Sequence, residues 1–174
     1  MQAQVESQAT DAELLAMARE GDSSAFSRLY SSCAPGLHLY AQSLTRDAHL
    51  ADDIVQEAYL RLFQRAGLNG SIASYLYTVA RHLAIDEFRL RASRKEPPRL
   101  VPRNAADAAD ADVIARALDS LAPEQREVVV LKHYGGLTFP QIAHVTSVPV
   151  GTAASRYRYA LDKLARLLTR RDVP

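Results

Sequence analysis

Small and hydroxyl side chains followed by arginines, near the C-terminus, are suited to contact with DNA. The segment Pro149-Val-Gly-Thr-Ala-Ala-Ser-Arg156 would let the end of a helix approach bases and phosphates closely, and Arg158 follows it. An arginine can donate two hydrogen bonds to the edge of a guanine or hold a phosphate. The chemistry indicated is recognition of duplex nucleic acid.

A helix-turn-helix is the element predicted to position these side chains. Thr138 with Gln141 forms a capping box at the start of a first helix. Residues 146–148 have the length of the tight turn between two crossing helices. Pro149 lies where a second helix begins, and the N-terminal residues of that helix contact base edges in the major groove. The alternative is that the arginines after Ser155 form only a solvated face.

Charge is segregated along the chain although the net charge is only +1. Residues 1–60 carry nine acidic and three basic side chains, whereas residues 61–104 carry nine basic and three acidic ones. Residues 105–133 are again acidic and residues 134–174 basic. Two basic blocks predict two contacts with a polyanion, and the acidic first block predicts a different, basic partner.

The N-terminal part is predicted to be a helical bundle. Thr10 with Glu13 begins one helix, and a second runs from about Asp22 with a break near Pro35. A helix from about residue 48 to 66 has its apolar residues at the spacing of one buried face, and a long helix begins after Ser71. The apolar stripe of the 48–66 helix is Ala51, Ile54, Val55, Ala58 and Leu62.

The composition excludes several classes of protein. No apolar run approaches the roughly 20 residues of a membrane span, and the first 20 residues are polar and acidic, unlike a secretory signal. The single cysteine, Cys33, allows no internal disulfide, and the five histidines show no ligand spacing. We expect a soluble, cytoplasmic protein with no catalytic residues, no metal and no cofactor.

The predicted fold class is all-α, with an N-terminal helical bundle and a C-terminal helix-turn-helix domain. The bundle is assigned to residues 10–95 and the helix-turn-helix domain to residues 112–171. Residues 96–111 are rich in Pro, Ala and Asp, have no apolar period, and are predicted to be a flexible linker.

Several motifs, in this order, resemble those of the small bacterial sigma factors called extracytoplasmic-function sigma factors, which have only regions two and four of the sigma-70 family. Ala51-Asp-Asp-Ile-Val-Gln-Glu-Ala-Tyr-Leu-Arg-Leu-Phe63 is similar to the polymerase-binding helix of that family. Tyr75-Leu-Tyr-Thr-Val-Ala-Arg-His-Leu-Ala-Ile-Asp86 is similar to its promoter-melting helix. Ala117-Leu-Asp-Ser-Leu-Ala-Pro-Glu-Gln-Arg126 and Gly151-Thr-Ala-Ala-Ser-Arg156 match its region four.

The resemblance implies a role for each group of residues. The implied partners are core RNA polymerase and promoter DNA, with an anti-sigma factor as a further candidate. The polymerase-binding residues would be Asp52, Asp53, Gln56, Glu57 and Arg61. The minus-ten DNA-binding residues would be Asn69, Tyr77, Arg81, His82, Arg89 and Arg91. The minus-35 DNA-binding residues would be Thr152, Ala153, Ser155, Arg156, Tyr159 and Lys163.

The sequence departs from the family pattern at a few positions. Tyr75 stands in place of the usual Trp, and Thr146-Ser147 replaces the customary Leu-Gly of the turn. Ser147 would then have to adopt a backbone conformation that Gly usually permits, at a cost of about 1 kcal/mol.

Two other functions stay open at this point. One is a helix-turn-helix regulator that acts without polymerase. Such a regulator would not need the acidic N-terminal bundle. The other is a helical adaptor that binds only proteins, for which the basic block after Arg156 would have no use.

Overall fold

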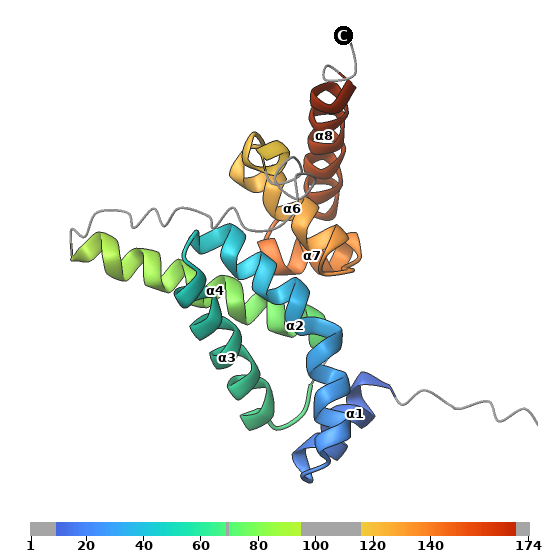
Figure 1. Cartoon of the computed structure of the whole chain (residues 1–174). Coiled ribbons are helices and arrows are strands. Elements are labelled where there is room, and N and C mark those ends of the chain that lie inside the picture. Colours follow the sequence, from blue (N-terminus) through green and yellow to red (C-terminus); the bar gives the residue numbers. More distant parts are fainter. Residues whose placement is uncertain (1–9, 69, 95–115, 170–174) are drawn as a thin grey trace, which may run out of the picture.

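The computed structural model describes residues 10–68, 70–94 and 116–169, and every regular element in these ranges is helical (Figure 1). The predicted all-α class is therefore confirmed. A helical turn at 116–119 precedes α6. In chain order the helices are α1 (Asp11–Arg19), α2 (Ser23–Thr45), α3 (Ala48–Gln64), α4 (Ile72–Ser93), α6 (Pro123–His133), α7 (Phe139–Thr146) and α8 (Val150–Thr169).

The helices of the N-terminal bundle, α1 to α4, begin at side chains that satisfy the free backbone N–H groups of a first turn. Thr10 and Glu13 form the predicted capping box of α1. The Asp22 carboxylate accepts hydrogen bonds from the backbone N–H groups of residues 24 and 25. Asp47 caps α3 and Ser71 caps α4 in the same way. These helix starts were all predicted from the sequence.

The prediction of a break near Pro35 is wrong, because α2 runs through this residue without interruption. Buried side chains lie on both sides of the proline, among them Leu29, Leu37 and Tyr40. Burial of this continuous apolar face outweighs the backbone hydrogen bond that a proline inside a helix removes.

The apolar stripe predicted for the 48–66 helix is buried, with Tyr59 added to it. The helix ends at Gln64, two residues earlier than predicted. Its last carbonyls are satisfied from α1, since the Arg19 guanidinium donates to the carbonyl of Leu62 at 2.8 Å and to that of Arg65. The side chain of Arg19 thus fastens α1 to the end of α3.

In the C-terminal unit, α6 to α8, the predicted helix-turn-helix is formed by α7 and α8. Thr138 and Gln141 make the capping box of α7. Ser147 follows α7 with φ 57° and ψ 42°, the left-handed conformation that was expected of it. Arg126 in α6 donates to the carbonyls of Leu118, Asp119 and Leu121, which holds the preceding helical turn against the unit.

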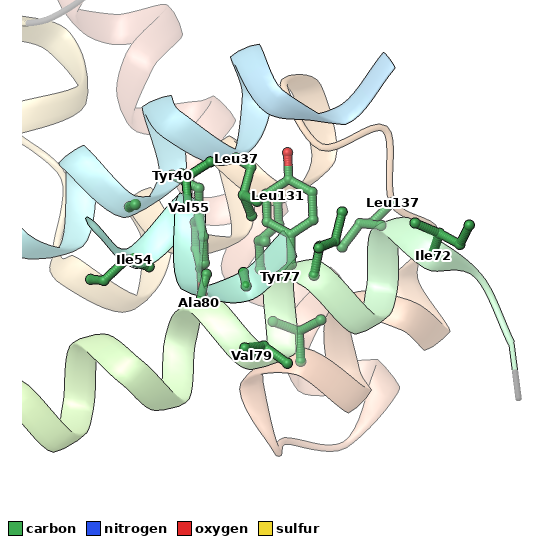
Figure 2. Close-up of a cluster of buried hydrophobic side chains, with 14 of the residues drawn as sticks. Leu37, Tyr40, Ile54, Val55, Ile72, Tyr77, Val79, Ala80, Leu131 and Leu137 are labelled. Atoms are coloured by element: carbon green, nitrogen blue, oxygen red, sulfur yellow. The ribbon is translucent and has the colours of Figure 1, made fainter. Parts of the chain in front are cut away.

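The two predicted parts share a hydrophobic core, and a second, smaller cluster of Leu121, Val129 and Ala160 lies within the C-terminal unit. Figure 2 shows Leu37 and Tyr40 of α2 and Tyr77 of α4 in one cluster with Leu131 of α6 and Leu137, which lies between α6 and α7. In addition, α7 packs along α4 and α6 packs against α2. We refer to this arrangement as the closed form. The predicted linker at 96–111 and Lys95 lie outside the described residues.

Candidate protein and nucleic-acid interfaces

The polar face of α3 is exposed. Asp52, Asp53, Gln56 and Arg61 are exposed and Glu57 is half-buried, while the opposite face of the helix lies in the core. Glu57 and Arg61 form an ion pair of 2.7 Å one turn apart, which contributes little to stability at such an exposed position. The closed form therefore leaves all five residues predicted to bind polymerase available to a partner.

An aromatic groove between α2 and α3 continues this face. Phe26 and Tyr30 of α2 stack at 5.8 Å between ring centroids, and Phe63 of α3 lies 5.7 Å from Phe26. Leu60 also lines the groove and is 49 % exposed. At one end His38 Nδ1 lies 3.2 Å from an oxygen of Asp52, which joins the groove to the acidic face.

These groove residues were not among the predicted site residues. A signal for them does exist, because Leu60 and Phe63 follow Gln56 at steps of four and three residues along the same side of the helix. Apolar side chains that continue an exposed polar face are candidates for a contact surface.

The face of α4 that was assigned to the minus-ten element is partly covered. Tyr77 is only 1 % exposed and lies in the shared core. Arg81 Nε donates to Oε1 of Glu127 in α6 at 2.9 Å. Tyr75 is half-buried, packs against the core and lies under the guanidinium of Arg65.

The remaining minus-ten candidates differ in their surroundings. His82 is exposed, and so is Arg89, 3.6 Å from Asp86. Arg91 is mostly buried and pairs with Glu87 at 2.7 Å and with the capping carboxylate Asp47 at 3.9 Å. Arg91 thus also has a structural role, because it ties the end of α4 to the start of α3. Asn69 lies outside the described residues.

Most residues of α8 that were assigned to the minus-35 element are accessible. Thr152, Ser155 and Arg156 are half-buried, while Tyr159 and Lys163 are exposed. Figure 1 shows α8 extending away from the N-terminal bundle. The prediction is wrong for Ala153, whose side chain is fully buried against the core, because its position one residue after Thr152 turns it to the inner side of the helix.

Side chains of α6 and α7 fix the orientation of α8. Tyr157 Oη and His133 Nε2 lie 2.8 Å apart, and the ring of Phe139 meets that of Tyr157 edge-on at 5.5 Å. Ala153 and Ala160, each about one turn from Tyr157, are fully buried. The residues facing outward on α8 are therefore held in a fixed register.

A buried carboxylate links the two halves of the molecule. One oxygen of Glu127 accepts a hydrogen bond from Tyr40 Oη at 2.8 Å as well as the one from Arg81. Burial raises the pKa of the Tyr40 phenol well above its usual value, and the negative charge of Glu127 adds to this. Sequence reasoning missed Tyr40 and Glu127, although the acid at position 127 precedes four apolar residues and so lies at the edge of a predicted core segment.

The described residues contain neither a helix able to cross a membrane nor a cluster of three or more His, Cys, Asp or Glu side chains arranged to hold a metal ion.

Models of protein families match both halves of the chain. Residues 29–94 match sigma-70 region 2, and residues 111–164 match sigma-70 region 4. The ECF RNA polymerase sigma factor SigL of Mycobacterium tuberculosis is 36 % identical over 149 residues, which cover 78 % of this chain and 84 % of that protein. The ECF RNA polymerase sigma factor RpoE of Cereibacter sphaeroides is 30 % identical over 156 residues, which cover 82 % and 86 %.

Two solved structures have a similar fold. The sigma factor RpoE in complex with the anti-sigma factor NepR from Bartonella quintana gives a TM-score of 0.64 at 22 % identity, over 83 % of this chain and 96 % of that one. CnrH in complex with the cytosolic domain of CnrY gives 0.65 at 24 % identity, over 94 % and 99 %.

Proposed function

The chain belongs to the extracytoplasmic-function group of the sigma-70 family, and we infer that it is a sigma factor, a subunit that binds core RNA polymerase and directs it to promoters. It recognises the promoter, assists the separation of its strands and so starts transcription. The chemistry of RNA synthesis stays with the polymerase. The proposed compartment is the cytoplasm, where polymerase and promoter meet.

The observation that carries this proposal is the presence of two different contact surfaces on one chain. The helix-turn-helix of α7 and α8 offers Arg156 and its neighbours to duplex DNA, while the bundle offers the acidic face of α3 and its aromatic groove to a protein. A regulator acting without polymerase would need only the first surface, and a protein adaptor only the second.

We propose that the acidic face of α3 binds basic helices of the largest polymerase subunit. Asp52 and Asp53 are exposed and lie opposite the buried stripe, so a basic partner can reach them without disturbing the core. Complementary charge accelerates encounter and selects the partner. The groove lined by Phe26, Tyr30 and Leu60 would supply the apolar centre that interfaces of this kind contain.

The two promoter elements are assigned to α4 and α8. Exposed Arg89 and His82 of α4 would hold the unwound minus-ten strand, together with Tyr77 and Arg81 once α6 has moved away from them. Arg156 of α8 would read a base in the minus-35 duplex, with Thr152 and Ser155 close to the backbone. An anti-sigma factor is a further proposed partner.

Run-off transcription tests the proposal directly. Purified core polymerase is given a library of promoter fragments with and without the full chain, and transcript starts are mapped. We expect discrete starts that require the chain. Tight, sequence-specific binding of the isolated chain to duplex DNA with no effect on polymerase would instead identify a regulator of the other kind.

A further inference from the structure

Two hydrogen-bond donors of the N-terminal bundle converge on a single point. Tyr40 Oη of α2 and Arg81 Nε of α4 lie 2.8 Å and 2.9 Å from the same oxygen of Glu127. Tyr40 is fully buried, and the Glu127 side chain is 9 % exposed. A cationic donor beside a neutral one, both facing a carboxylate oxygen, is the arrangement of an anion-binding site. Here the C-terminal unit of the same chain supplies the anion.

The same contact leaves one polar group without a partner. The Tyr77 hydroxyl is buried and forms no hydrogen bond with any described residue, and its ring lies edge-on to that of Tyr40 at 5.2 Å. A buried hydroxyl without a partner is rare and destabilises the arrangement that contains it. The closed form therefore satisfies the donors at Glu127 but not the adjacent hydroxyl on the same face of α4.

Two glycines allow the halves to approach this closely. A Cβ atom added to Gly36 of α2 would collide with the backbone carbonyl oxygen of Tyr134 and would lie 2.5 Å from the Tyr77 hydroxyl. One added to Gly135, just after α6, would lie 3.0 Å from Cζ of the Tyr77 ring in α4. The contact around Glu127 thus depends on an approach of backbones that a single methyl group would prevent.

We propose that Tyr40 and Arg81 form a phosphate site for the unwound promoter strand, and that Glu127 occupies this site in the closed form. The proposal rests on the assignment of α4 to the minus-ten element and adds to it a residue of α2 and a competing anion. A phosphodiester carries one negative charge and acceptor oxygens, so it offers Arg81 and Tyr40 what the carboxylate offers them. Glu127 and a phosphate cannot occupy the site together, and departure of α6 would also free the Tyr77 hydroxyl for water or a base.

Competition of this kind makes strand binding depend on opening. The apparent association constant for a strand is the intrinsic association constant multiplied by the fraction of molecules that are open. A variant that weakens the closed contact without changing the donors should therefore bind single-stranded DNA more tightly. A purely structural ion pair between Arg81 and Glu127 would give no such gain.

The test uses the full chain and a fluorescein-labelled single-stranded oligonucleotide of mixed sequence, with affinity measured by anisotropy. Glu127→Gln keeps the size and the acceptor oxygen but removes the charge. Gly36→Ala adds a methyl group to α2 that would collide with the backbone of Tyr134, so it opposes closure. It leaves both donors, Tyr40 and Arg81, unchanged. Each should raise the radius of gyration measured by X-ray scattering and tighten strand binding by about tenfold, through the larger open fraction.

The decisive measurement is made in the opened background. Adding Tyr40→Phe to Gly36→Ala should reverse most of the gain in affinity, whereas adding Tyr134→Phe, which changes an exposed side chain at the end of α6, should not. Equal affinities for these two double variants would overturn the phosphate site. If Gly36→Ala fails to fold, Glu127→Gln replaces it as the background for the same pair of substitutions.

Failure of this inference is distinguishable from failure of the proposed function. If the chain directs core polymerase to discrete starts but Tyr40→Phe leaves strand affinity unchanged in the opened background, only the phosphate site is wrong. If no starts depend on the chain, the function itself is wrong, whatever the oligonucleotide measurements give.

Discussion

The polar faces of α3 and α4 belong to neighbouring helices of one bundle, yet they differ in their exposure to solvent in the closed form. The carboxylates of α3 are open to solvent, whereas Tyr77 and Arg81 of α4 are covered by α6 and by the turn that follows it. A protein partner can thus reach the molecule at α3 while part of the nucleic-acid surface is still occupied. Under our proposal, access to polymerase and access to the melted strand are controlled separately.

The largest effect is expected from reversing the charge of the exposed α3 face, which tests whether this face binds polymerase. Asp52→Lys with Asp53→Lys should abolish binding to core polymerase, because like charges brought together at an interface cost several kcal/mol. Competition for core polymerase against a labelled sigma factor measures this. Glu124→Lys with Asp162→Lys makes the same change in net charge at exposed positions of α6 and α8 and should bind normally. Unchanged affinity of the Asp52 and Asp53 variant, with a native circular dichroism spectrum, would exclude this face.

Two arginines that take no part in the Glu127 contact distinguish the role of α8 from that of α4. Arg156→Ala should reduce discrimination at one or two upstream base pairs by about 1–3 kcal/mol, since a bidentate contact to guanine would be lost. Arg89→Ala should instead slow strand opening and leave the upstream preference unchanged.

A promoter library scored for each variant, with strand opening followed by permanganate reactivity, separates the two effects. Arg166→Ala is the control for α8, because it lies about 15 Å further along the helix at 1.5 Å per residue. An Arg156→Ala variant with the same upstream preference as the parent chain would show that another feature, such as DNA shape, is read there.

Alkaline pH should destabilise the fold in part through two buried tyrosines at the contact of the two halves. Burial raises the pKa of both Tyr40 and Tyr77 above their usual value of 10.0. Above about pH 10 these two tyrosines lose protons in the unfolded chain that they retain in the folded chain, so their contribution to the free energy of unfolding, present in full below that pH, falls as pH rises. Urea unfolding between pH 8 and pH 11 measures the slope. It should be shallower for Tyr77→Phe and unaltered for Tyr159→Phe, and an equal slope in both would contradict the assignment.

Tyr77→Phe has the smallest expected effect, and together with Tyr40→Phe it tests the contact most specifically. At pH 7, Tyr77→Phe should raise the free energy of unfolding by about 1 kcal/mol, because it removes a buried hydroxyl that has no partner. Tyr40→Phe should lower it by about 1.5–3 kcal/mol, because its hydroxyl donates to a carboxylate. Thermal or urea unfolding of the two variants measures the sign of each change in the free energy of unfolding. A destabilised Tyr77→Phe variant would mean that the hydroxyl has a partner in solution.

Local signals in the sequence predicted much of the fold. Capping side chains such as Thr10, Asp47 and Thr138 fix where helices begin, since each satisfies backbone groups a few residues away. The buried stripe of α3 follows from its spacing alone. Pro35 was misinterpreted because the preference of one residue is weaker than the burial of a continuous apolar face, and this burial depends on helices distant in sequence.

The exposed part of the candidate site was easier to predict than the covered part. Asp52 and Arg89 are exposed because nothing in their own helix buries them, and periodicity is sufficient to see this. The burial of Tyr77 and the pairing of Arg81 with Glu127 depend on how the two halves meet, for which no local pattern exists. Ala153 was predicted to face DNA because it belongs to a run of small residues, whereas the helical period turns its side chain to the inner side of α8.

The cap that Arg19 provides has a consequence for anyone who cuts or recombines such chains. The region that matches the sigma-70 region 2 model begins at residue 29, so α1 and Arg19 lie before it. A fragment or chimaera trimmed to the matched boundaries would leave the carbonyls of Leu62 and Arg65 without their donor. The end of α3 would then fray into the connection that leads to α4. Exchanged modules should therefore start before α1.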